Sequence, residues 1–73
     1  MVSVELLEKI INLRIKLQDS NKYKNKNIMI IRATNIVKLL YRENTKTHVI
    51  YKININSGDI FDGSNRIGNI NSF

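Results

Sequence analysis

The side chains that most often carry out catalysis or bind metals are scarce in this sequence. Cys is absent, His48 is the single histidine, and the six acidic residues are dispersed along the chain. One group of residues is a candidate for chemistry. Asp59 and Asp62 could form a hydrolytic or metal-binding corner with His48 and Arg66 if the local turns converge. Asp in such glycine-containing turns, however, commonly hydrogen-bonds its own backbone. We therefore favour a turn-forming role, and expect no enzymatic activity, no metal and no cofactor.

Positive charge is concentrated in the middle of the chain. The 73 residues include twelve Lys and Arg against six acids, for a net charge of +6. Ten of the cations and two of the acids lie between residues 14 and 52, so this segment carries +8 and its two flanks carry −1 each. This segregation favours a nucleic acid or another polyanion as the partner. A chance solvated surface is the alternative, because Ile, Asn and Lys make up 32 residues, the bias of an AT-rich genome.

A lysine-rich segment offers the clearest candidate for contact with nucleic acid. In the run Lys-Tyr-Lys-Asn-Lys at residues 22–26, the three cations could follow phosphates while the tyrosine stacks on an unpaired base. The other interpretation is a solvated loop with the tyrosine folded over the edge of the core. Two further cations, four residues apart, would share one helix face and repel each other unless an anion lay nearby. The candidate nucleic-acid-binding residues are Lys22, Tyr23, Lys24, Lys26, Lys38 and Arg42.

These residues are positioned by the elements that the pattern of the first half predicts. Ser3 can cap a helix that begins at Val4, and the apolar residues of this helix cover about half of its circumference, enough to contact more than one neighbour. Residues 19–27 lack aliphatic side chains and indicate a loop. The apolar run 28–31 predicts a short buried strand, with a helix reaching back from residue 43 as the alternative. Thr34 could cap a second helix over residues 35–43 with a basic outer face.

The second half of the chain has the pattern of a β-meander. From Thr47 onward the period is two, with Val49 among the residues expected on the core side. Turns at 57–58 and 62–65 separate two further short strands, near 59–61 and 66–70. The opposite side of this meander is a candidate partner interface, an apolar patch rimmed by cations. Its residues are Ile50, Lys52, Phe61 and Arg66.

Three uses of that second sheet face stay open. It could stack RNA bases, as aromatic-bearing sheets do. It could dock a protein partner or a second copy of the chain. It could also be covered by the C-terminal tail through Phe73.

We expect residues 1–73 to form a single small basic α+β domain, with two helices packed on a small antiparallel sheet formed mainly by the C-terminal β-meander. A chain of this size has a thin core. The N-terminal residues lack the pattern of a secretion signal, and no apolar run is long enough to cross a membrane, so we expect an intracellular protein, cytoplasmic or nuclear.

Two hypotheses for function follow. The first is a non-catalytic accessory protein bound to RNA or to a ribonucleoprotein, held mainly by phosphate contacts. The alternative is a protein–protein interaction module, such as an adaptor, an inhibitor or an obligate oligomer, that uses the Phe61 face of the sheet or the wide apolar face of the first helix.

Overall fold

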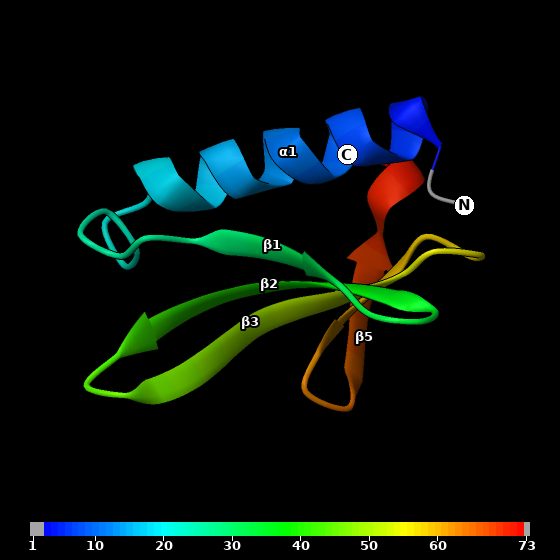
Figure 1. Cartoon of the computed structure of the whole chain (residues 1–73). Helices are drawn as coiled ribbons and strands as arrows, with labels where there is room; N and C mark the ends of the chain where they lie inside the picture. The colour runs from blue at the N-terminus through cyan, green and yellow to red at the C-terminus, as the bar shows by residue number, and fades with distance from the viewer. Residues whose placement is uncertain (1–2, 73) are drawn as a thin grey trace.

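The computed structural model describes residues 3–72, which form one helix packed across a five-stranded antiparallel sheet (Figure 1). The strands follow one another in sequence order, β1-β2-β3-β4-β5, so each pairs with its neighbours in the chain. The α+β class predicted from the sequence is confirmed. The elements are α1 (Val4–Asp19), β1 (Met29–Arg32), β2 (Ile36–Glu43), β3 (Lys46–Asn54), β4 (Asp59–Asp62), β5 (Asn65–Asn69) and the single 3-10 turn η1 (Ile70–Ser72).

Helix α1 begins where the sequence predicts. The side chain of Ser3 accepts a hydrogen bond from the Leu6 N–H at 3.1 Å and satisfies one of the free donors of the first turn. Ile10 and Leu13 are buried against the sheet, where the core also contains residues of β2, β3 and β4 together with Ile28, just before β1, and Ile70 of η1. The centre of that core is aliphatic, and it includes Leu39, Ile53 and Ile60, which are all 0 % exposed.

The second predicted helix is wrong: residues 36–43 form strand β2. The apolar residues of this segment fit one face of a helix, but they fit equally a strand with both faces partly apolar. Val37 and Leu39 enter the core, while Lys38 and Leu40 lie on the opposite side. Pairing with β1 on one side and β3 on the other satisfies the backbone of β2, and this tertiary context overrides the local pattern. The predicted strand at 28–31 is confirmed as β1, shifted by one residue, but it is an edge strand whose residues are half-buried or exposed rather than buried.

A β-bulge in β3 moves two residues from their predicted sides. Leu39 pairs with Tyr51 and Leu40 with Val49, so Ile50 is an extra residue without a partner on β2. The bulge reverses the alternation beyond it. Consequently Val49, expected inside, is 42 % exposed, and Ile50, expected in the partner interface, is 6 % exposed and belongs to the core.

The remaining strands confirm the predicted C-terminal meander. Ile60 pairs with Ile53, and four residues connect β3 to β4. Gly58 closes this connection with φ +80, and its N–H donates to the Asn54 carbonyl at 2.8 Å. A Cβ at this position would lie 2.9 Å from the Asn71 side chain, so glycine is required both for conformation and for space. Phe73, proposed as a cover for the sheet, lies outside the described residues.

Candidate nucleic-acid interface

One face of the sheet packs against α1, and we call the other the open face. Strand registers place one transverse row of side chains on it, because residues paired across antiparallel strands point to the same side. The row contains one residue from each strand: Ile31, Lys38, Lys52, Phe61 and Arg66. These residues face away from α1 because their chain neighbours Val37, Ile53 and Ile60 are buried in the core.

Lys38 and Lys52 are directly opposite each other in this row. Paired side chains stand about 5 Å apart at their Cβ atoms, and like charges in that position destabilise a sheet. Both side chains are half-buried, so their aliphatic stems lie along the sheet while the ammonium groups reach solvent. Within residues 3–72 no ion pair involves either lysine. The two charges therefore form an uncompensated cationic pair on the open face.

Apolar side chains surround this pair. Phe61 is the partner of Lys52 on β4 and is half-buried. In the adjacent row Leu40 lies between Met29 and Val49, and Leu40 is only 5 % exposed although it is separate from the main core. Arg42, two residues further along β2, lies on the same side and is exposed. The open face thus combines an aromatic ring, an aliphatic surface and three cations without carboxylate partners.

Arg66, at the end of the row, is different because it is neutralised. Its Nε donates to Asp59 Oδ1 at 2.9 Å, and Asn69 Nδ2 donates to the same oxygen at 3.1 Å. The hydrogen bond from Arg66 lowers the pKa of the Asp59 carboxyl, with a further contribution from Asn69. Asp59 is therefore part of a surface ion pair and holds Arg66 along β5.

The proposed hydrolytic or metal-binding corner is not assembled. His48 stacks on the Tyr41 ring, with centroids 4.9 Å apart, and no contact joins it to Asp59. Asp62 shares with His48 only the lining of a shallow polar hollow of about 320 Å³. Across residues 3–72, no three His, Cys, Asp or Glu side chains are grouped as ligands for a metal ion.

The lysine-rich loop lies elsewhere, between the end of α1 and the β2–β3 hairpin (Figure 1). Tyr23 packs on the edge of the core, and its ring lies 5.9 Å from that of Tyr41. Lys26 forms an ion pair with Glu43, whose hydrogen bond raises the pKa of Lys26 and is the main cause of the lowered pKa of Glu43. Lys22 lies 5.4 Å from the Tyr23 ring centre.

Gln18 holds this loop in place. Its Nε2 donates to the carbonyls of Tyr23, at 3.0 Å, and of Lys26. This geometry corresponds to the interpretation in which the tyrosine is folded over the core. In that position Tyr23 is not free to stack on a base without rearrangement.

The structure therefore divides the residues predicted as a nucleic-acid site. Lys22, Tyr23, Lys24 and Lys26 stay together on the loop, whereas Lys38 and Arg42 lie on the open face. There they join three residues from the predicted partner interface, Lys52, Phe61 and Arg66, while Ile50 does not belong to this surface. The sequence signal for this surface is the strand pattern of residues 36–43. If this segment is a strand beside β3, Lys38 and Lys52 both lie on the side of the sheet away from the core, where they can be paired.

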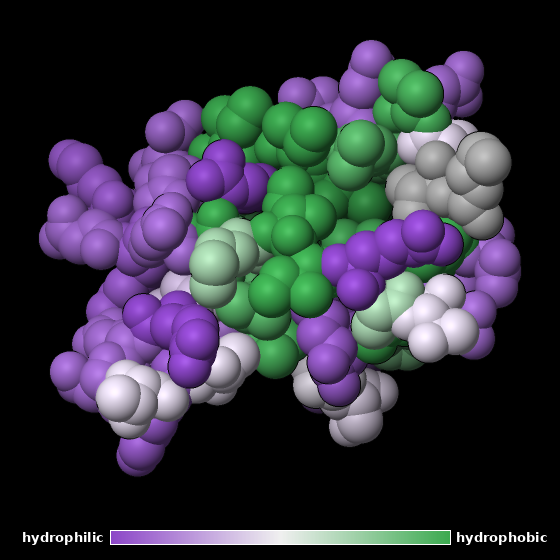
Figure 2. Space-filling model, viewed as in Figure 1, coloured by the Kyte–Doolittle hydropathy of each residue, from purple (hydrophilic) through white to green (hydrophobic). Residues whose placement is uncertain are grey.

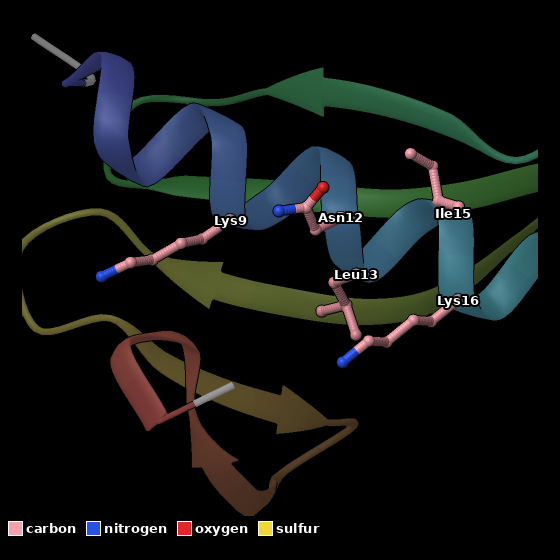
Figure 3. A pocket seen from close by; sticks show the side chains of 5 residues that line it. All are labelled: Lys9, Asn12, Leu13, Ile15 and Lys16. Carbon is pink, nitrogen blue, oxygen red and sulfur yellow. The ribbon is translucent and has the colours of Figure 1, made fainter.

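A hollow of about 270 Å³ lies beside α1. Figure 3 shows Lys9, Leu13 and Lys16, three of the residues that line it, extending toward the C-terminal hairpin. Lys9 Nζ donates to Asn71 Oδ1 at 3.0 Å, so this cation ties the helix to η1.

The 16-residue helix α1, the one α-helix of the described part, is too short to cross a membrane.

Comparisons of the chain with protein-family models, with curated proteins and with solved structures found no match.

Proposed function

We propose that this chain is a non-catalytic RNA-binding protein, an accessory component of a ribonucleoprotein, that binds single-stranded RNA on the open face of its sheet. The observation that supports this most is the cationic pair of Lys38 and Lys52 beside the Phe61 ring. Two opposed lysines cost folding free energy in the free protein, and a bound phosphate removes that repulsion. An aromatic ring adjacent to phosphate-binding cations provides a surface on which an unpaired base stacks.

Single-stranded RNA fits this surface better than a duplex does. The bases of a duplex are stacked on each other and cannot reach a half-buried ring in a sheet, whereas the bases of a single strand can be splayed out. Arg42 extends the cations along β2 from Lys38, so a strand of RNA would run from the row of Lys38, Lys52 and Phe61 toward the hairpin of β2 and β3. The loop residues Lys22 and Lys24 lie outside this path and are not required by the proposal.

The proposal is tested by measuring the affinity for a fluorescently labelled single-stranded RNA over a range of salt concentrations. Each phosphate contact with a single strand contributes a slope of about −0.7 to log K against log salt, so three cations predict a slope of about −2. The double variant Lys38→Gln/Lys52→Gln should reduce the magnitude of that slope by about 1.4. Lys9→Gln, a change of the same kind on α1, should leave it unchanged.

Two results would contradict the proposal. The first is the absence of RNA binding at low salt, which would leave an acidic protein as the partner for the same cations. The second is an equal slope in the wild type and in the double variant, which would place the phosphate contacts elsewhere.

A further inference from the structure

Strand β1 is an outer edge of the sheet, and part of its backbone has no partner. The Ala33 N–H donates to the Ile36 carbonyl at 2.8 Å, so by alternation the N–H and C=O groups of residues 29 and 31 also point to β2. The backbone N–H and C=O groups of Ile28, Ile30 and Arg32 point away from β2, toward the free edge of the sheet. At Ile28, α1 satisfies both groups: Arg14 Nε donates to its carbonyl at 2.7 Å and its N–H donates to Gln18 Oε1 at 3.3 Å. Within residues 3–72 no hydrogen bond satisfies the outward groups of Ile30 and Arg32.

An exposed apolar stripe of α1 lies beside this edge. Val4, Leu7, Ile11 and Ile15 are 73 %, 43 %, 38 % and 48 % exposed, and their spacing places them along one side of the helix. A shallow groove joins the stripe to the strand, and it is lined by Ile11 of α1 and by Ile28 and Ile30 on the side of β1. Figure 2 shows the resulting hydrophobic surface, which extends over α1 and β1 without interruption by another element.

A two-fold axis through the strand edge also passes the middle of the stripe. Outward groups at residues 30 and 32 specify an antiparallel self-pairing in which Ile30 of one copy is opposite Arg32 of the other, with the axis at Ile31. Ile31 is about 10 Å along β1 from Ile28 at roughly 3.3 Å per residue, and α1 runs antiparallel to β1 (Figure 1). Arg14 and Gln18 of α1 contact Ile28, so the part of α1 beside Ile28 is centred near residue 16. A helix rises 1.5 Å per residue, so 10 Å corresponds to about seven residues toward its N-terminus. The axis at Ile31 therefore passes α1 near residues 9 and 10. The stripe from Val4 to Ile15 is centred there.

The charges of α1 agree with the same arrangement. A two-fold axis at this point places the two helices antiparallel. The acids Glu5 and Glu8 lie in the first half of α1 and Arg14 lies in the second half, whereas Lys9 and Lys16 extend toward the C-terminal hairpin, away from the stripe. The axis therefore brings the N-terminal half of each helix, with its two acids, beside Arg14 and the C-terminal half of the other helix, where the dipole has the opposite sign. Lys38 and Lys52 point to the open face, so their repulsion does not enter the contact.

We infer that the chain forms a symmetric homodimer in which β1 pairs with β1 of a second copy and the two α1 stripes pack against each other. A second copy presents a strand edge and an apolar stripe in matching register about one axis, as a self-complementary two-fold interface requires. A small domain without disulfides also gains stability from such a partner. This inference does not depend on RNA binding, although the dimer would bring two open faces into one continuous sheet surface.

The mass of the protein in solution tests the association directly. We expect sedimentation equilibrium of the full chain to give twice the 8.5 kDa monomer mass. Leu7→Lys and Ile11→Lys should each weaken the dimer by about tenfold or more, because each buries a charge in the stripe. Ile67→Lys, at an isoleucine that is also 48 % exposed but lies on β5, should leave the dimer intact.

A disulfide tests the register. The chain has no cysteine, so Ile31→Cys introduces a single thiol at the axis, where the two copies face each other as a close, non-hydrogen-bonded pair. Mild oxidation should link this variant almost completely into a dimer, whereas Val49→Cys, with similar exposure on β3, should remain largely unlinked. A monomer at all concentrations would overturn the inference. So would a dimer in which the two cysteine variants cross-link equally, because the contact would then lie elsewhere.

Discussion

Lys38→Glu is expected to weaken the binding of single-stranded RNA by about tenfold or more while leaving the fold at least as stable as that of the wild type. The substitution removes one phosphate contact and adds a repulsive charge on the open face. In the free protein it converts an opposed pair of lysines into an opposed pair of opposite charge. Such a cross-strand pair contributes about 0.2–1 kcal/mol, so the free energy of unfolding should rise slightly. Binding and stability should therefore change in opposite directions.

The two quantities are measured by anisotropy of labelled RNA and by urea unfolding. Lys24→Glu makes the same change of net charge in the exposed loop, and it should have a much smaller effect on affinity. A general electrostatic effect would make the two variants equal. A larger loss in Lys24→Glu would move the RNA site to the loop, and a loss of stability in Lys38→Glu would show that Lys38 supports the fold rather than a ligand.

Ile53→Ala is expected to cost about 2–5 kcal/mol of folding free energy. Ile53 is 0 % exposed and is paired with Val37 on β2 and with Ile60 on β4, so truncation leaves a cavity where three strands meet the helix. A domain of 73 residues is stable by only roughly 4–11 kcal/mol, and the variant should therefore lose a large part of its stability.

Urea unfolding followed by circular dichroism measures this loss. Ile67→Ala is the matched control, because Ile67 is a bulge residue of β5 that is 48 % exposed. We expect the control to cost less than about 1 kcal/mol. If the two substitutions cost the same, the core does not lie between α1 and the centre of the sheet.

Much of the fold could be predicted from the sequence, because local signals and tertiary context agree over most of the chain. Ser3 and the apolar period define α1, and the turn residues around Gly58 and Gly63 separate β3, β4 and β5. Residues 36–43 were the exception. Their apolar positions satisfy a helical and a two-faced strand pattern equally, and the choice is made by pairing with β1 and β3, which are distant in the sequence.

The candidate site could be predicted only in part, and for the same reason. The excess of cations between residues 14 and 52 is visible in the sequence, but which of them share a surface depends on strand register. Lys52 and Phe61 were placed on one sheet face correctly, whereas the bulge at Ile50 removed that residue from it. Bulges change the side of every residue beyond them, and alternation alone gives no signal for their position.

The most direct test of RNA binding by the open face is a nuclear magnetic resonance titration of the isotope-labelled protein with a short single-stranded RNA. We predict that the backbone amides of Lys38, Arg42, Lys52 and Phe61 shift, while those of α1 and of the loop at residues 20–27 remain in place. Shifts confined to the loop, or an unchanged spectrum at low salt, would contradict the assignment of RNA binding to the open face.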